Sequence, residues 1–527
     1  LAVMADADRQ RFIEADALMA TLFVGGRQWT IRHDDSSKRQ KVGQYYQIDI
    51  AMTANMLSFS YLRRSLLVLA LPLCCFTLLA HAATGPAPLP SALNGALQEA
   101  RLPAANAAFL VQRVDADKPL LAHNIGKRMN PASTMKIVTT YAALELLGPA
   151  HTWKTEALAD TPLRDGKLAG NLYLRGSGDP SLTQERFWLL LRQLRARGVT
   201  HIAGDLILDR SAFRLPPHDP AAFDNEPLRP YNAGADALLV NFKSLRLTLS
   251  PDPATRSTQA IPETPAEDLR VSGHIALSEG DCGDWREKLR ITTDGNNIDV
   301  SGSYASACGE KALHLTPWGA DAQVERLFRV LWRELGGTFS GQVRDGETPA
   351  GARLIATHES PPLGEIVRDV NKWSNNVMAR QLFLATAPTR PATPEGARLR
   401  IEKWLQEKGV EGTVLDNGAG LSRNERVTAE GLGKLLLAAW KSPVMPEMMA
   451  SLPIAGADGT LKRRLGKSAA AGRAHLKTGY IEGVRAIAGY VLDRSGQRWV
   501  VVGLLNDPQM KSGSAPLDAL VRWVAER

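Results

Sequence analysis

A serine and a lysine three residues apart are the first pair in this sequence that could carry out covalent catalysis. Ser133 and Lys136 form the only Ser-x-x-Lys in the chain, at the start of a helical pattern just after Pro131. Positions i and i+3 share one face of a helix, so the hydroxyl and the amine should lie together. A serine needs an adjacent base to become a nucleophile, and a lysine can serve when burial or a second cation lowers its pKa. At a helix N-terminus, backbone N–H groups would also lie near a developing oxyanion.

A second group of candidate residues lies towards the C-terminus, where Lys477-Thr478-Gly479 leads a strand-like stretch. Lys477 can bind a carboxylate, and Thr478 can donate a hydrogen bond to it. Gly479 would let a substrate backbone approach the strand closely. Alone, the triplet is equally compatible with an edge strand whose lysine is exposed to solvent.

Two Ser-x-Asn tripeptides compete for a third role. Ser374-x-Asn376 opens the helical pattern of residues 377–384, whereas Ser422-x-Asn424 lies in a loop. The amide of Asn376 could orient a peptide substrate while Ser374 relays a proton. We prefer the first tripeptide because of its helical context, although either serine could instead cap a helix.

The order and spacing of these motifs are more specific than any motif alone. They are separated by 241 residues from Ser133 to Ser374 and by 103 from Ser374 to Lys477. Together they resemble the acyl-serine signature of penicillin-binding proteins and serine β-lactamases. The long first interval resembles the D-alanyl-D-alanine carboxypeptidase/endopeptidase family of low-molecular-mass penicillin-binding proteins, which carry inserted domains there. Further runs similar to that family are 175–180, 231–241, 416–423 and 452–460, so the likeness covers essentially all of 100–527.

The resemblance implies an α+β fold: a penicillin-binding transpeptidase-like, or serine β-lactamase-like, domain with an antiparallel sheet, helices on both faces and inserted, mostly β domains. It implies a serine-type carboxypeptidase or D,D-endopeptidase that acts on peptidoglycan stem peptides ending in D-Ala-D-Ala. Such an enzyme works through an acyl-serine and is inhibited by β-lactams. No cofactor and no metal are expected. Two alternatives stay open, a β-lactamase and a penicillin- or peptidoglycan-binding module that does not turn over.

The same resemblance implies a role for each motif residue. Ser133 would attack the D-Ala carbonyl, and Lys136 would accept its proton. Ser374 and Lys477 would pass a proton to the leaving amine. Lys477 and Thr478 would hold the terminal carboxylate of the substrate.

Tyr480 departs from the family pattern, which has a small hydroxyl residue after Lys-Thr-Gly. Its backbone N–H would still complete an oxyanion hole with that of Ser133, so catalysis should survive.

The resemblance also places a substrate side-chain pocket near Glu226, next to Pro227. We expect Glu226 to bind the free amine of the diamino acid in the stem peptide. The alternative is a surface-loop glutamate.

Hydrophobic patterns suggest how the chain positions these residues. Strands are expected at 107–114, 119–122, 202–209 and 238–242, with a hairpin of 288–292 and 298–301. We assign 83–158 and 352–527 to the catalytic domain, 159–235 and 316–351 to an inserted domain, and 236–315 to a second, smaller β domain.

The N-terminal region has the order of a secretory leader. Residues 56–82 comprise a basic start, an apolar run and the small-x-small sequence Ala80-His81-Ala82, which predicts a cleaved signal peptide and a periplasmic protein. Residues 1–55 would then be a mis-assigned upstream segment, or else a cytosolic extension on an anchored protein.

The net charge is +8, from 63 basic and 55 acidic residues, without a basic cluster that would favour nucleic acid. Peripheral membrane association and oligomeric state stay open.

Only two cysteines follow the predicted leader, Cys282 and Cys308. In an oxidising compartment such a pair is expected to form a disulfide. The alternative is two buried thiols.

Overall fold

The structure is a computed structural model that describes residues 21–24, 27–30, 89–510 and 513–527. The chain divides into two compact units, 1–81 and 82–527. In the first unit, β1 (Thr21–Val24) and β2 (Arg27–Thr30) form an antiparallel hairpin. The predicted signal peptide lies outside the described residues. No helix in the described part of the chain is long and apolar enough to cross a membrane.

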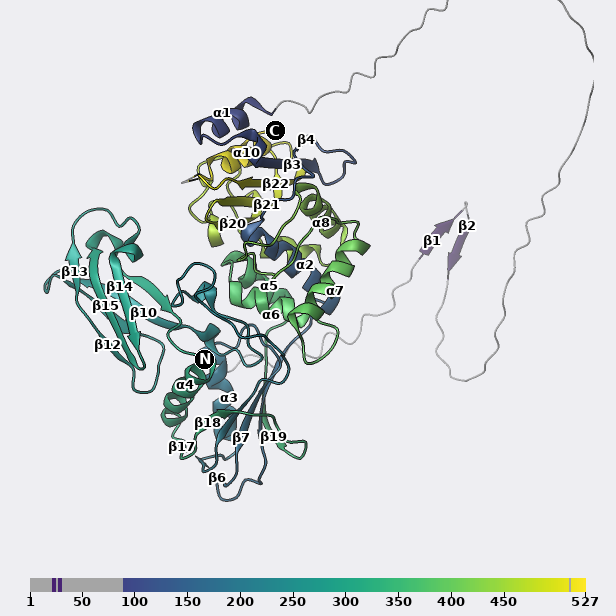
Figure 1. Cartoon of the computed structure of the whole chain (residues 1–527). Helices are drawn as coiled ribbons and strands as arrows, with labels where there is room; N and C mark the ends of the chain where they lie inside the picture. The colour runs from purple at the N-terminus through teal and green to yellow at the C-terminus, as the bar shows by residue number, and fades with distance from the viewer. Residues whose placement is uncertain (1–20, 25–26, 31–88, 511–512) are drawn as a thin grey trace, which may run out of the picture. The chain divides into compact units, whose positions relative to one another are not determined.

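The second unit contains a main sheet of five antiparallel strands in the order β20-β21-β22-β3-β4 (Figure 1). Its strands are β3 (Ala107–Arg113), β4 (Leu121–His123), β20 (Ala474–Ile481), β21 (Val484–Leu492) and β22 (Arg498–Asn506). The pairing of β3 with β22 joins the two ends of the catalytic region in one domain. β20 is an edge strand whose first residues, 474–476, hydrogen-bond on their outer side to 453–455.

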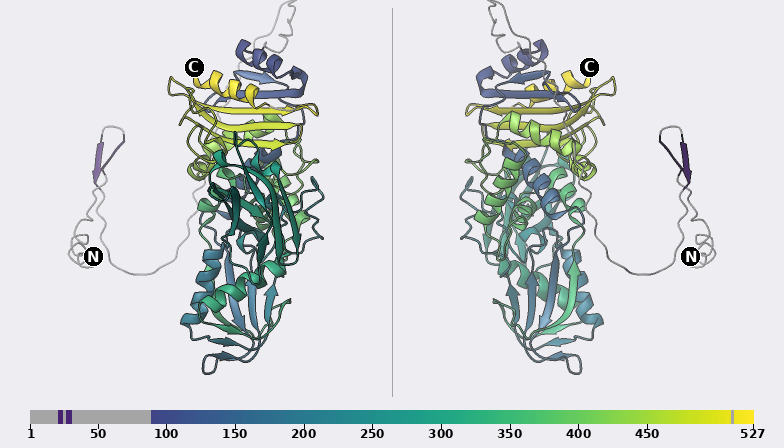
Figure 2. Two further views of the ribbon diagram at one scale, coloured as in Figure 1. Left: turned by 90° about the vertical axis from the view of Figure 1, so that its left-hand side faces the viewer. Right: turned by 90° about the vertical axis from the view of Figure 1, so that its right-hand side faces the viewer.

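Helices cover both faces of the main sheet, which confirms the fold class that the resemblance implied (Figure 2). On one face, α1 (Ser91–Glu99) packs with α10 (Ala515–Ala525), and their apolar residues meet those of the sheet. On the other face, α8 (Ala429–Lys441) packs against β3 and β22. Beyond α8 lie α2 (Met135–Leu147), α5 (Leu363–Lys372), α6 (Asn376–Ala385), α7 (Pro394–Glu407) and α9 (Met445–Ser451).

α2 is the central helix of this layer. Every residue from Met135 to Leu144 is buried, because the helix is apolar almost all round and other helices enclose it. Its one buried cation, Lys136, lies in the first turn, beside the short 3-10 helix η2 (Ala132–Thr134). Packing of α2 therefore fixes the position of Lys136.

The inserted domain is built on a five-stranded sheet in the order β18-β9-β7-β5-β19. Its strands are β5 (Lys154–Ala159), β7 (Leu172–Gly176), β9 (Leu206–Asp209), β18 (Val343–Asp345) and β19 (Arg353–Glu359); a smaller sheet contains β6 (Lys167–Leu168), β8 (His201–Ile202) and β17 (Thr338–Phe339). The chain enters through β5 and returns through its antiparallel neighbour β19. Pairing therefore places 154–158 and 353–359 in the insert sheet, whereas the sequence analysis assigned both segments to the catalytic domain.

Two helices of the insert were not expected from its strand-like runs. α3 (Gln184–Ala196) begins at Thr183, whose hydroxyl accepts from the Arg186 N–H, and α4 (Ala320–Glu334) packs beside it. Both bury apolar residues at helical spacing against the insert sheet. The expectation of a mostly β insert overlooked these patterns.

Two of the expected strands are wrong. The run 202–209 divides into β8 and β9, which belong to different sheets, because the chain turns at Gly204. A Cβ at Gly204 would lie 2.3 Å from the carbonyl oxygen of Gly170, so only glycine fits there. The run 238–242 is not a strand either, since Asn241, Phe242 and Lys243 all have positive φ in the short helix η4 (Asn241–Lys243).

The second insert is a seven-stranded sheet with its own apolar core. Its strands are β10 (Leu245–Asp252), β11 (Ser257–Pro262), β12 (Arg270–Ser272), β13 (Ile275–Ser278), β14 (Leu289–Asp294), β15 (Asn297–Ala305) and β16 (Lys311–Leu315). The expected hairpin is present as β14 and β15, with Asp294 paired to Asn297 across a two-residue turn. Cys282 and Cys308 are joined by a disulfide beside this core.

The disulfide should stabilise the second insert without acting on the catalytic residues. Its sequence separation is 26, for which loop closure contributes about 3.5 kcal/mol in the chain-entropy model. We expect Cys282→Ser to lower the melting temperature clearly while the rate of acylation by penicillin stays near that of the parent protein. Calorimetry and a stopped-flow acylation assay measure the two quantities. An unchanged melting temperature would contradict this assignment.

Candidate active site

The backbone around Ser133 is held between two glycines. Ala132 has a φ of 43°, a strained value for a non-glycine residue, and directly precedes Ser133. A Cβ at Gly420 would lie 2.0 Å from the Ala132 carbonyl oxygen, and one at Gly479 would lie 2.6 Å from that of Pro131. The close approach of the 416–420 loop and of β20 therefore depends on both glycines.

Lys136 is fully buried and contacts three oxygen atoms from three parts of the chain. Its Nζ lies 3.0 Å from Ser133 Oγ and 2.7 Å from Asn376 Oδ1, and it also donates to the Ala419 carbonyl. The last two oxygens can only accept. A neutral amine has two N–H bonds for them and one lone pair left for the Ser133 hydroxyl.

Electrostatics favours this neutral form. Burial lowers the pKa of Lys136 well below its usual value, and the positive charge of Lys477 lowers it further. Glu425 acts in the opposite direction and Arg380 in the same direction as Lys477. Lys136 is thus suited to accept a proton from Ser133.

The orientation of the Asn376 amide follows from its second contact. Nδ2 donates to the Tyr231 carbonyl at 3.1 Å, which leaves Oδ1 to face Lys136. Asn376 is the first residue of α6, after a turn in which Ser374 has a φ of 55°. The Asn375 side chain caps the helix by accepting from the Met378 N–H.

Ser374 and Lys477 form a second hydroxyl–amine pair. Lys477 Nζ donates to Ser374 Oγ at 2.9 Å and to the Thr478 carbonyl at 2.8 Å. Burial lowers the pKa of Lys477 to about 7. The Thr478 hydroxyl lies 2.8 Å from that of Thr460. The structure thus contains two hydrogen-bonded groups, Ser133–Lys136–Asn376 and Ser374–Lys477. They form one cluster because Ser374 and Asn376 share a turn and the charge of Lys477 acts on Lys136, and Thr478 lies beside it.

Tyr480 points away from this cluster. Its side chain is 68% exposed, and the Arg485 guanidinium lies 3.9 Å from the ring centroid. Only its backbone lies in β20, next to Gly479 and to the η2 turn.

The competing serine, Ser422, has a structural role. Its hydroxyl donates to Asp416 at 2.6 Å and accepts from the backbone N–H groups of Asn424 and Glu425. It makes no hydrogen bond to either lysine. Ser422 thus stabilises the loop that contacts Lys136.

Glu425 is a central residue that the motif analysis missed. It is fully buried, and its Oε1 accepts from the N–H groups of Asp416, Asn417 and Gly418. Burial raises the pKa of Glu425 to about 7. The run 416–423, which resembles the family, ends two residues before Glu425 and indicates no role for it.

Glu226 does not join the cluster. It is exposed and pairs with Arg229 at 3.3 Å. Its neighbour Asp224 accepts from the Tyr231 hydroxyl and from the Asn232 amide. Since Tyr231 also contacts Asn376, Glu226 lies on a segment that borders the site.

The contacts of the two serines predict different effects of their removal. Ser374→Ala removes the hydroxyl bonded to Lys477, and we expect a loss of about 100-fold or more in acylation rate, as for a proton-transfer group. Ser422→Ala removes a loop contact and should cost far less activity but about 1 kcal/mol of stability. Acylation kinetics and thermal unfolding of both variants measure this contrast. Equal losses of activity would contradict it.

Comparisons with known proteins agree with this geometry. Residues 89–527 match the model of the D-Ala-D-Ala carboxypeptidase 3 (S13) family. The chain is 32% identical over 459 residues to a D-alanyl-D-alanine carboxypeptidase of an Actinomadura species, covering 82% of this chain and 84% of that protein. It is 27% identical over 425 residues to D-alanyl-D-alanine carboxypeptidase DacB of Haemophilus influenzae, covering 78% and 88%.

A solved structure is similar over the same region. The crystal structure of penicillin-binding protein 4 from Haemophilus influenzae superposes with a TM-score of 0.68 and 27% identity, over 82% of this chain and 97% of that one. A second structure of that protein, complexed with a β-lactam, gives a TM-score of 0.64. The family model covers most of the chain and a relative is 32% identical over 82% of it, so the chain belongs to the D-Ala-D-Ala carboxypeptidase 3 (S13) family.

Proposed function

We propose that this protein is a serine D-Ala-D-Ala carboxypeptidase, with D,D-endopeptidase activity on crosslinks of similar geometry, that acts on peptidoglycan stem peptides. The observation that carries the proposal is the buried amine of Lys136, 3.0 Å from the Ser133 hydroxyl and with two other acceptors for its N–H bonds. The names of the relatives support the substrate class.

Acylation begins with attack of Ser133 Oγ on the carbonyl carbon of the penultimate D-Ala. Lys136 takes the hydroxyl proton on its lone pair as the C–O bond forms. Asn376 holds the amine in place through its Oδ1, and the Tyr231 carbonyl holds the amide. The N–H groups of Ser133 and Tyr480 stabilise the tetrahedral oxyanion.

The leaving amine receives its proton through the second hydroxyl–amine pair. Ser374 donates its proton to the D-Ala nitrogen and regains one from Lys477, 2.9 Å away. Lys477 and Thr478 also bind the terminal carboxylate of the substrate. Gly479 lets the peptide lie along the edge of β20. The proton that Lys136 took from Ser133 then passes to Lys477, which replaces the one given to the leaving amine and leaves Lys136 neutral again. Water attacks the acyl carbon while Lys136 takes a proton from it, and Lys136 returns that proton to Ser133 Oγ as the C–O bond of the acyl-serine breaks.

Penicillin would acylate the same serine. Its strained β-lactam carbonyl and its carboxylate are arranged like the carbonyl and terminal carboxylate of the stem peptide. The β-lactam complex of the related penicillin-binding protein 4 supports this part of the proposal. A β-lactamase would release penicillin quickly, and a binding module would not turn over peptide, so a turnover assay separates the three functions.

We place the enzyme in the periplasm, where peptidoglycan is accessible. The predicted leader at 56–82 supports this location, with a mature N-terminus at or near Ala83. N-terminal sequencing of the exported protein tests the cleavage site.

The function is tested by release of D-Ala from a stem pentapeptide and by cleavage of a crosslinked dimer. We expect turnover of the pentapeptide by the parent protein and none by Ser133→Ala, with an unchanged circular dichroism spectrum. Mass spectrometry should place a penicillin adduct on Ser133. An adduct on another residue, or rapid penicillin hydrolysis without D-Ala release, would contradict the proposal.

The lysine pair predicts a specific change in pH dependence. Acylation requires unprotonated Lys136, so its rate rises as pH increases through the Lys136 pKa. The charge of Lys477 lowers that pKa, so Lys477→Gln should raise the pKa of Lys136. The rising acid limb of the pH–rate profile should then move to higher pH. The measurement is the penicillin acylation rate between about pH 5 and 9, the range in which shifted lysines titrate. Thr478→Val, which removes a hydroxyl but no charge, should leave the limb in place; a limb that stays fixed in Lys477→Gln would contradict the coupling.

Glu226 is our candidate for binding the amine of the stem-peptide diamino acid. Its exposure makes it accessible, and its ion pair with Arg229 is an exchangeable surface pair. We expect Glu226→Gln to raise KM for a diamino-acid peptide about fivefold, as for an exposed ion pair of up to about 1 kcal/mol. A peptide with the amine acetylated should show no difference between the variants. Unchanged kinetics with the free amine would refute the assignment.

A further inference from the structure

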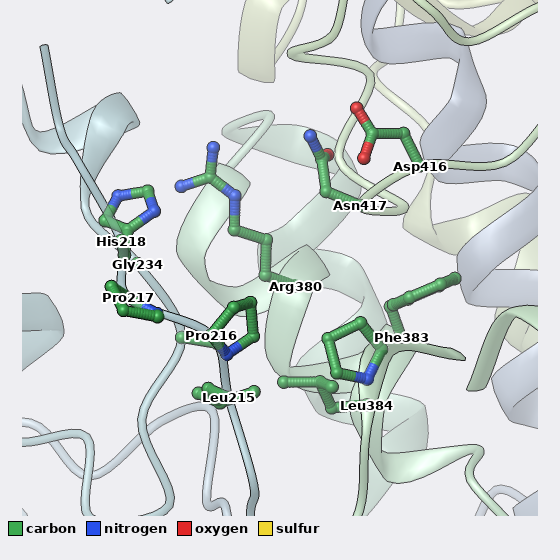
Figure 3. A pocket seen from close by; sticks show the side chains of 12 residues that line it. Leu215, Pro216, Pro217, His218, Gly234, Arg380, Phe383, Leu384, Asp416 and Asn417 are labelled. Carbon is green, nitrogen blue, oxygen red and sulfur yellow. The ribbon is translucent and has the colours of Figure 1, made fainter. Parts of the chain in front are cut away.

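A cavity of about 300 Å³ lies between α6 and residues 215–218 of the insert (Figure 3). None of the residues proposed for catalysis lines it. The residues that line the cavity are apolar at one end and polar at the other. Leu215, Pro216, Phe383 and Leu384 form an apolar end, whereas a guanidinium, an amide and an imidazole gather at the other end.

The guanidinium belongs to Arg380, which lies one helical turn beyond Asn376 on α6. Its Nη1 donates to the Ala233 carbonyl, and among the described residues Nε and Nη2 make no hydrogen bond. The charges of Glu425 and Asp416 act on the guanidinium and raise its pKa, without a direct ion pair. Burial lowers the Arg380 pKa to about 10, so the group remains charged at neutral pH. The cation is therefore partly compensated, but its free N–H groups can still donate charge-assisted hydrogen bonds to an anion in the cavity.

The other polar groups of the cavity are compatible with an anion. Burial lowers the pKa of His218, which stays neutral at pH 7 and contacts the Asn232 carbonyl through Nε2. Asp416 is the one acid of the lining, and its Oδ2 already accepts from Ser422. In Figure 3 the amide of Asn417 stands between Asp416 and the guanidinium.

We propose that this cavity is an effector site for a small carboxylate with an apolar body. The carboxylate would bind the Arg380 guanidinium and the Asn417 amide, and the body would contact Phe383 and Leu384. A cavity of about 300 Å³ is at the lower end of small-molecule sites, which fits a ligand with one ring or a short branched chain. The polar and apolar ends together select an amphipathic anion over a neutral or a purely ionic ligand.

The cavity shares a wall with the loop that contacts the catalytic lysine. Asn417 Oδ1 accepts from the Ala419 N–H, and the Ala419 carbonyl accepts from Lys136. Besides burial, Lys136 is influenced by Lys477 and Arg380, which lower its pKa, and by Glu425, which raises it. An anion on Arg380 would cancel one of the two lowering charges. Occupancy should therefore favour protonated Lys136 and slow acylation; this second step rests on the function proposed above.

Binding is tested by calorimetry on the purified protein with 3-phenylpropionate and with its neutral amide. We expect saturable one-to-one binding of the carboxylate, and binding at least about tenfold weaker for the amide, because a charge-assisted hydrogen bond is lost. Prior acylation with penicillin should leave binding intact. Loss of binding in the acylated protein would place the probe at Lys477 and overturn the proposal.

Two variants locate the site. Arg380→Gln should weaken binding about tenfold or more, whereas Arg368→Gln, an exposed arginine on α5, should not change it. Leu215→Trp should fill the apolar end and abolish binding without altering charge or basal acylation. Equal binding by all variants, or by the amide, would refute the site, and these measurements do not depend on enzymatic turnover.

The effector role has its own readout. Saturating 3-phenylpropionate should slow acylation of the parent protein by about fivefold, at the lower end of measured allosteric coupling, and should leave the rate of Leu215→Trp unchanged. Binding at the cavity without any change in acylation rate would overturn the effector role.

Discussion

The central constraint of this structure is the burial of two lysine amines in one site. Burial lowers the pKa of both Lys136 and Lys477, and the charge of Lys477 lowers that of Lys136 further. A neutral Lys136 amine directs its lone pair at the Ser133 hydroxyl only if fixed acceptors hold its N–H bonds. Asn376 and Ala419 supply these acceptors for Lys136 from two segments far along the chain. The rest of the domain holds those segments at hydrogen-bond distance.

Lys136 and Asn376 are 240 positions apart in the sequence, and the topology explains how they still meet. The chain leaves the catalytic domain through β5 and returns through β19, which are hydrogen-bonded neighbours. Entry and exit therefore lie side by side, and both inserts can grow without moving α2 relative to α6. Tyr231 in the insert nevertheless contacts Asn376, so the insert also shapes the rim of the site.

Sequence reasoning predicted which residues lie together at the candidate site better than it predicted the architecture. The motif pattern brought together Ser133, Lys136 and Lys477, and the helix start at Asn376 separated Ser374 from Ser422, because those signals are local. It missed α3 and α4 and the buried Glu425, whose meaning depends on packing partners distant in sequence. The insert begins and ends one strand outside the limits expected from the sequence. The pairing of β5 with β19 that defines those limits cannot be predicted from either segment alone.

Glu425 shows that positioning and reactivity compete within the site. Its carboxylate gathers three N–H groups of the loop that ends in Ala419 and Gly420, and without it those donors would be buried without partners. The same negative charge raises the pKa of Lys136 and opposes its function as a base. Burial raises the pKa of Glu425 itself to about 7, so part of that charge is absent at neutral pH. The loop thus keeps its hydrogen-bond acceptor, while desolvation and the charge of Lys477 outweigh the remaining opposition and hold the pKa of Lys136 well below its usual value.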